Sequence, residues 1–135
     1  MKKCLIVLLL GVMLIGNQAL ITFADNGNGI IISPYWMNTS SVSGNLNVNG
    51  NTANFSILIN GNPNVTEISA TVTLYYKNSW DNWVKTDTEW EYSINSDVLA
   101  IYETFDATPG TEYKVELEAH VYANGITEIV TKKFT

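Results

Sequence analysis

The sequence contains few of the residue types on which most catalytic and metal-binding sites depend. Among its 135 residues there is no arginine, one histidine and one cysteine. Because the cysteine, Cys4, lies in an apolar N-terminal run, the rest of the chain has no thiol for catalysis or for a disulfide. His120 alone cannot complete a zinc site without an all-carboxylate ligand set, and no local serine motif accompanies it. We therefore expect no enzyme activity, no metal site and no cofactor, with His120 as a solvated strand residue.

The first 24 residues have the pattern of a secretory signal peptide. Two lysines precede an apolar run of 12 residues, Cys4 to Ile15, and small side chains stand at Thr22 and Ala24. Such a run is shorter than the 18 or so residues that a spanning helix needs. We predict cleavage after Ala24, secretion and no stable membrane insertion; retention of the segment as an anchor is the alternative. Residues 25–29 then form a flexible leader and residues 30–135 a single domain.

The charge balance excludes two further classes of partner. Beyond residue 24, five lysines stand against 13 acidic residues, which gives a formal net charge of −8. Nucleic acids and anionic membranes both need a basic footprint on the protein that binds them. We therefore expect neither partner, and we expect a monomer whose stability comes from one hydrophobic core.

From residue 30 onward, apolar residues recur mainly at every second position, which is the period of a strand with one buried face. Asn-Gly and Pro-Gly pairs and other turn residues separate these alternating runs. No segment after Ala24 has the spacing of an amphipathic helix. The pattern predicts an all-β domain of about seven or eight strands, folded as an antiparallel two-sheet β-sandwich.

The alternation also predicts which side chains enter the core. We expect Ile30–Ile32 to form a short edge strand, Tyr35–Met37 to plug one end of the core, and a bulge in the final run, where Ile126, Val130 and Phe134 compete with Ile129. Outward positions are expected for Lys114, Glu116, Glu118, His120 and Tyr122. Inward positions are expected for Val42, Leu46, Val48, Ala53, Phe55, Ile57, Ile59, Ile68, Ala70, Val72, Leu74, Tyr76, Trp90, Tyr92, Leu99, Ile101, Phe105, Tyr113, Val115, Leu117, Ala119 and Val121.

The segment from Thr108 to Leu117, Thr-Pro-Gly-Thr-Glu-Tyr-Lys-Val-Glu-Leu, resembles the start of the sixth strand in fibronectin type III domains. The resemblance implies a fibronectin type III-like or immunoglobulin-like sandwich, in which Pro109 and Gly110 lead into the strand and Tyr113 forms a tyrosine corner. The family usually buries a tryptophan where this chain has Phe55, and Trp36 is a candidate to supply that bulk. The whole chain also resembles small secreted proteins of Gram-positive bacteria that carry one such sandwich and have no assigned activity.

Clustered aromatic residues are the feature of the sequence most relevant to binding. Trp80, Trp83 and Trp90, with Tyr75 close by, fall in one predicted hairpin region. Exposed together, they would form a platform for stacking sugar rings or a partner's apolar patch. The alternative is that Trp83 and Trp90 fill the core and only Trp80 is solvated.

Two acidic patterns in the sequence do not match a catalytic or calcium-binding site. Glycoside hydrolysis needs two carboxyl groups across a cleft, one with a raised pKa, whereas Glu89, Glu91, Glu116 and Glu118 have outward parities. Residues 81–87 contain acidic and amide side chains, Asp81, Asn82 and Asp87, but their spacing matches no calcium loop. We therefore expect a secreted, non-enzymatic module that binds a protein, cell-envelope or glycan partner. A carbohydrate-binding protein with an aromatic platform is the alternative, followed by an envelope-acting hydrolase.

Overall fold

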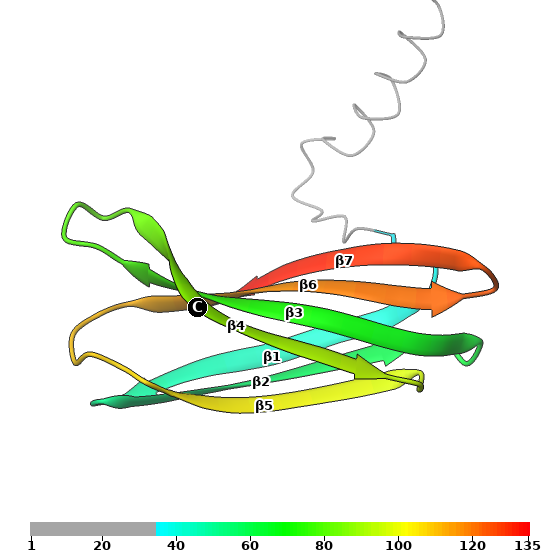
Figure 1. Cartoon of the computed structure of the whole chain (residues 1–135), viewed down its shortest axis with the longest axis horizontal. Helices are drawn as coiled ribbons and strands as arrows, with labels where there is room; N and C mark the ends of the chain where they lie inside the picture. Colours follow the sequence, from blue (N-terminus) through cyan, green and yellow to red (C-terminus); the bar gives the residue numbers. More distant parts are fainter. Residues whose placement is uncertain (1–34) are drawn as a thin grey trace, which may run out of the picture. The chain divides into compact units, whose positions relative to one another are not determined.

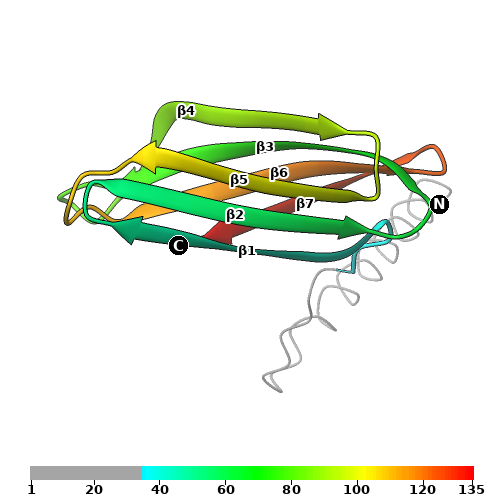
Figure 2. The same ribbon diagram turned by 90° about the horizontal axis from the view of Figure 1, so that it is seen from below.

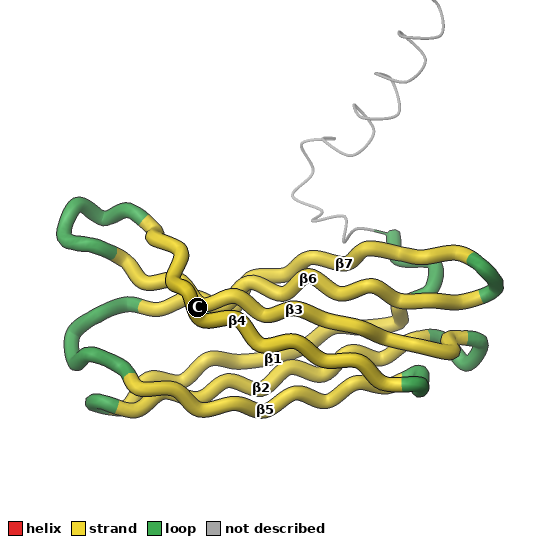
Figure 3. Tube along the Cα trace, viewed as in Figure 1, coloured by secondary structure: helices red, strands yellow, loops and turns green. Residues whose placement is uncertain are grey.

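The computed structural model describes residues 35–135. The predicted signal peptide, the leader and the strand expected at Ile30–Ile32 lie outside these residues. The chain divides into two units, Met1–Tyr35 and Trp36–Thr135, and the architecture below is that of the second. Its segments are strands joined by turns, with no helix between residues 35 and 135 (Figure 3).

Seven strands form two antiparallel sheets that lie face to face (Figures 1 and 2). One sheet has three strands in the order β1-β2-β5, and the other has four in the order β4-β3-β6-β7. The all-β, two-sheet prediction is thus confirmed for the described residues. The strands are β1 (Thr39–Asn49), β2 (Thr52–Gly61), β3 (Val65–Lys77), β4 (Trp83–Ile94), β5 (Val98–Asp106), β6 (Tyr113–Ala123) and β7 (Ile126–Phe134).

The core lies between the sheets and is built from the alternating side chains of both. Phe55, Val72 and Val121 are fully buried, and each belongs to a different strand. The observed burial confirms the inward prediction for the middle of β2, β3, β5 and β6. The prediction holds there because consecutive side chains of a strand point to opposite faces. Apolar burial of this kind, at about 25 cal/mol per Å², stabilises the sandwich in the absence of a disulfide.

Two side chains predicted to face the core are more than a third exposed. Val48 and Tyr76 have exposed fractions of 38% and 37%. Each lies at the end of its strand, next to a turn. The β3–β4 hairpin, whose first strand ends at Lys77, bends away from the three-stranded sheet (Figure 1). The alternation of side chains along a strand does not show where the opposite sheet ends.

The bulge predicted in the last strand is absent, and one occurs in β4 instead. β7 pairs with β6 without any register shift, from Ala123–Ile126 to Val115–Phe134. Val130 and Phe134 are buried while Ile129 is 59% exposed. In β4 the register with β3 shifts opposite Leu74, where the Thr86 hydroxyl donates to the Leu74 carbonyl at 2.9 Å.

Side chains from β7 connect the two sheets along one side of the sandwich. Glu128 faces inward, and its carboxylate accepts hydrogen bonds from the Thr39 hydroxyl (2.6 Å) and amide (2.9 Å) at the start of β1. Lys132 donates to the Val42 carbonyl of β1 at 2.6 Å. On the opposite side, the Tyr92 hydroxyl of β4 donates to Glu103 of β5 at 2.7 Å. Inward charges also protect an edge strand from pairing with another chain.

The segment before β1 only partly fills its predicted role. Trp36 packs against the core, whereas Tyr35 is 90% and Met37 is 63% exposed. The plug is therefore a single residue. The following residue, Asn38, is buried, and its side-chain amide donates to the Val121 carbonyl at 3.1 Å. The segment is held by polar contacts, which the pattern of hydrophobic residues does not predict.

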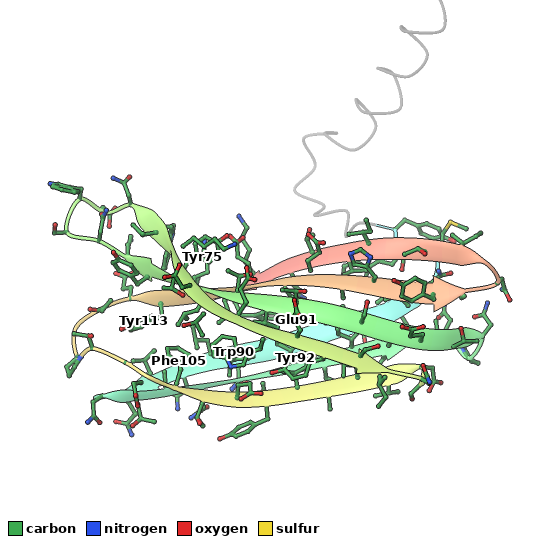
Figure 4. All side chains as sticks on the ribbon, viewed as in Figure 1. Tyr75, Trp90, Glu91, Tyr92, Phe105 and Tyr113 are labelled. Atoms are coloured by element: carbon green, nitrogen blue, oxygen red, sulfur yellow. The ribbon has the colours of Figure 1, made fainter. Side chains whose placement is uncertain are left out.

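A row of aromatic rings runs through one end of the core (Figure 4). Phe55 packs edge-on against Trp90 with 5.0 Å between ring centroids. Trp90 contacts Phe105 at 6.0 Å, and Phe105 contacts Tyr113 at 5.4 Å. The indole against Phe55 is therefore that of Trp90 on β4. Trp36, the candidate named from the sequence, also packs against the core.

Candidate functional site

The outer face of the four-stranded sheet carries a polar trough along β3. Its floor is a row of hydroxyl side chains, Ser69, Thr71 and Thr73, each facing away from the core. Carboxylates of β4 and β6 flank the floor, because the register sets Thr71 between Glu91 and Glu118 and sets Thr73 between Glu89 and Glu116. Two hollows of 530 and 330 Å³ share Thr71 and Glu118 and so form one continuous depression. We call this surface the outer trough.

Lysines neutralise the carboxylates at one end of the outer trough. Lys85 lies 2.8 Å from Glu89, and Glu116 lies 2.8 Å from Lys114 and 3.4 Å from Lys133. The hydrogen bond and the charge of Lys85 lower the pKa of Glu89. Burial raises the pKa of Glu116, but the two lysines outweigh it and the net shift is downward. Both groups are thus held ionised, which is the opposite of what a general acid requires.

The other end of the outer trough keeps its negative charge. Between residues 35 and 135, no lysine pairs with Glu91, and Glu118 has only His120 at 3.1 Å. The hollow at this end is lined by Glu91, Glu118, His120 and Tyr122 among others. His120 lies on the outer face, as predicted, with its side chain 35% exposed.

Lys114 departs from the prediction of a solvated outward residue. It does face outward, yet only 7% of it is exposed. Its ammonium lies 4.6 Å from the ring centroid of Tyr75, 4.8 Å from that of Trp83 and 2.8 Å from a Glu116 oxygen. Two aromatic faces and a carboxylate thus replace water around the charge. No local pattern in the sequence indicates this contact, because it depends on the β3–β6 register that sets Tyr75 opposite Lys114.

The four aromatic residues considered for a platform do not lie together. Trp90 lies in the core, whereas Tyr75 lies on the outer side of the four-stranded sheet (Figure 4). Trp83 has Lys114 at 4.8 Å and Lys77 at 5.7 Å from its ring centroid. Trp80 is 80% exposed in the β3–β4 turn. Neither the platform interpretation nor the core interpretation holds fully. Trp83 is outside the core, and the ammonium groups of two lysines lie over its ring.

The turn before β6 has the geometry expected around Tyr113. The Thr111 amide donates to the Thr108 carbonyl at 3.1 Å, and Gly110 has φ of +80°. Proline at the second position and a positive φ at the third are typical of a type II turn. The Tyr113 hydroxyl accepts a hydrogen bond from the Thr108 amide at 2.8 Å. The ring and the hydroxyl of Tyr113 therefore fix the end of β5 relative to β6.

Other kinds of site find little support among residues 35–135. There, no three acidic, histidine or cysteine side chains come close enough together to hold a metal ion. Asp81, considered for calcium, instead pairs with Lys77 at 2.8 Å. None of the described segments is a helix long and apolar enough to cross a membrane.

Fold and surface together define a β-sandwich with a polar trough on one sheet. No protein-family model matches the sequence, and no curated protein matches it. Among solved structures, the chain is similar to the solution structure of R. palustris CsgH, with a TM-score of 0.37 and 12% sequence identity. The similarity covers 70% of this chain and 91% of that one. A likeness of this size carries no inference about function.

Proposed function

We propose that this protein is a secreted, non-enzymatic binding module that holds a cationic partner in the outer trough. The observation that carries the proposal is the uncompensated half of the trough, where Glu91 and Glu118 flank the hydroxyl of Thr71 beside an open hollow. The export pattern of the first 24 residues supports a partner outside the cell. The partner class is a lysine- or arginine-rich protein segment.

Two features support a fibronectin type III-like assignment of the sandwich. In immunoglobulin-type folds, strands A, B and E share one sheet while C, F and G share the other, and extra strands join beside C. Lettered in chain order, the present sheets are A-B-E and C′-C-F-G, with β4 as C′. The hydrogen bond from the Thr108 amide to Tyr113, five residues later, matches a tyrosine corner.

Charge complementarity favours a cationic partner over a neutral or anionic one. Opposite charges attract over about 8–10 Å at physiological salt, and the formal net charge of −8 beyond residue 24 acts in the same direction. The floor hydroxyls of Ser69 and Thr71 both donate and accept hydrogen bonds. An extended peptide that lies along β3 would therefore find acceptors for its ammonium groups on both sides and hydroxyl partners below.

The absence of enzyme activity belongs to the same proposal. A retaining or inverting glycosidase needs one carboxyl group that stays protonated until it acts. The lysines beside Glu89 and Glu116 lower the pKa of each carboxyl group. Glu91 and Glu118 lie on the rim of an open depression and not in an enclosed pocket.

Fluorescence anisotropy of a labelled octalysine peptide tests the proposal. We expect the purified chain to bind it, and we expect the double variant Glu91→Gln/Glu118→Gln to weaken binding about ten-fold, since two exposed ion pairs contribute about 1–2 kcal/mol together. The matched control is Asp97→Asn/Asp106→Asn, which removes the same charge away from the trough and should weaken binding less than two-fold.

Two results would contradict the proposed function. Equal weakening by both double variants would show that only net charge matters and that the trough is not the site. Failure of octalysine to bind at 20 mM salt would exclude a cationic partner. Unfolding in urea should give nearly the same midpoint for both variants, because Glu91, Glu118 and Asp106 are exposed and the Asp97 side chain accepts a long hydrogen bond of 3.4 Å from Ser96, its only one within the described part of the chain.

A further inference from the structure

The outer face of the three-stranded sheet is almost without charge, in contrast to the rest of the chain. The antiparallel register arranges its side chains in five cross-strand rows of three. Only one of the fifteen residues is charged at neutral pH, Asp106 at the end of the last row. The rows are Ser41-Asn60-Val98, Ser43-Leu58-Ala100, Asn45-Ser56-Tyr102, Asn47-Asn54-Thr104 and Asn49-Thr52-Asp106. We call this surface the amide face; Figure 2 looks onto its sheet.

An exposed aromatic ring stands near the middle of the amide face. Tyr102 is 67% exposed and Leu58, in the neighbouring row, is 38% exposed. A hollow of 330 Å³ lies between these two rows, and small side chains line it, among them Ser43, Ser56 and Ala100. The small neighbours leave the face of the Tyr102 ring open. Among residues 35–135, the Tyr102 hydroxyl has no hydrogen-bond partner within the protein.

The amide face is rich in groups that must be paired if a partner covers it. Asparagine side chains both donate and accept hydrogen bonds, as do serine and threonine hydroxyls. Some already pair with each other, as Asn60 does with Ser41 at 3.0 Å. The row Asn47-Asn54-Thr104, next to the row of Tyr102, makes no such side-chain bond within the described part of the chain. Covering these groups with an apolar surface would leave them unpaired, which is costly.

We propose that the amide face binds a neutral polysaccharide. A sugar polymer supplies hydroxyl groups that donate and accept, so it pairs buried amides that an apolar protein patch would leave unsatisfied. Its pyranose rings have apolar faces that stack on an exposed tyrosine. An acidic polymer would be repelled by the negative chain, and a basic one would find no counter-charge on this face. A second copy of the chain would bring the same unpaired amides and fits less well.

The rows match the shape of an extended chain. Successive rows along a strand are two residues apart, about 6.7 Å, so the five rows span about 27 Å. A linear polymer can therefore contact Tyr102 and the neighbouring row Asn47-Asn54-Thr104 together. This surface lies on the opposite side of the sandwich from the outer trough, and the inference does not depend on the proposed function.

Affinity electrophoresis tests the inference with defined probes. The full chain is run in native gels that contain one of four neutral polysaccharides, a β-1,3-glucan, a β-1,4-mannan, a xylan or a dextran, or the anionic polygalacturonate. We expect at least one neutral polymer to retard the protein and polygalacturonate not to. Tyr102→Ala should weaken the retardation at least ten-fold, and Asn54→Asp at least five-fold. The control Trp80→Ala removes an exposed ring elsewhere on the protein and should change the retardation less than two-fold.

Several outcomes would overturn the inference. No retardation by any of the four neutral polymers would exclude it, and loss of retardation in Trp80→Ala but not in Tyr102→Ala would move the site to the β3–β4 turn. Sedimentation showing a dimer that Tyr102→Ala dissociates would assign the face to a second copy. Octalysine binding should be unchanged in Tyr102→Ala, so that failure of this inference and failure of the proposed function are distinguishable.

Discussion

Replacement of Glu128 by glutamine should destabilise the sandwich more than any other single loss of a surface carboxylate. The Glu128 carboxylate accepts hydrogen bonds from the amides of Met37, Asn38 and Thr39 and from the Thr39 hydroxyl. These bonds connect β7 of one sheet to the start of β1 in the other. Glutamine keeps the size of the side chain but has one acceptor oxygen, and its amide group would face backbone donors.

The expected loss follows from the number and kind of these bonds. A hydrogen bond to a charged group contributes about 1.5–3 kcal/mol, and an unpaired buried donor costs about as much. Because Glu128 is only half-buried, solvent weakens the effect, and we expect a loss of about 1.5 kcal/mol at pH 7. For a unit of about 100 residues this corresponds to a decrease in Tm of about 8 °C.

The effect of Glu128 should also depend on pH. Burial raises its pKa, but the Thr39 hydroxyl and the three backbone amides outweigh this and lower the pKa below the ordinary value of 4.5. The stabilisation is therefore complete at pH values above 4.5 and disappears as the pH falls through the folded-state pKa. At pH 2–3 the wild type and Glu128→Gln should approach equal stability.

Urea unfolding followed by tryptophan fluorescence at pH 7 and at pH 2.5 measures this difference. Glu91→Gln makes the same chemical change at a carboxylate that has no hydrogen-bond partner among residues 35–135, and it should cost less than about 0.5 kcal/mol. Thr39→Val in the Glu128→Gln background should cost less than it does in the wild type, because the partner is already lost. A loss at pH 7 no larger than that of Glu91→Gln, or a difference that persists at pH 2.5, would refute the reasoning.

Two further substitutions test the packing within the sandwich. Tyr113→Phe removes the acceptor of the Thr108 amide, and we expect a loss of about 1 kcal/mol in urea unfolding; an unchanged midpoint would show that the tyrosine corner contributes only its ring. Gly44→Ala would place a Cβ atom 2.6 Å from the Ser56 carbonyl oxygen, so β1 must shift away from β2; we expect a loss of about 2 kcal/mol, whereas a gain in thermal stability would contradict the close approach.

The alternation of apolar residues predicted the strands well because a strand that buries one face needs such a pattern. In β2, the inward residues Ala53, Phe55, Ile57 and Ile59 are all buried. The pattern failed at strand ends and in β7, where Glu128 faces inward because its carboxylate finds backbone donors in the neighbouring sheet. From the sequence, Glu128 has the pattern of a solvated residue, because its hydrogen-bond partners lie about 90 residues away along the chain.

The binding surfaces were harder to predict because they depend on register. Which side of the sheet Tyr75 and Lys114 face follows from parity alone, but their mutual contact follows from the β3–β6 pairing. Likewise, the sequence shows that the outer side of each strand of the amide face has few charged residues. Only the pairing of β2 with both β1 and β5 reveals that the face has a single charged residue, Asp106, at its end.

The sequence by itself determined the all-β class, the strand positions and the turn before Tyr113, because these depend on local alternation and on residues such as Gly110 that permit a positive φ. The tertiary structure alone decided which strands are neighbours. That choice buried Lys114, brought Trp90 against Phe55 and separated an acidic trough from an uncharged face. The physical reason is that side-chain contacts across strands depend on sheet order and register, which no local pattern specifies.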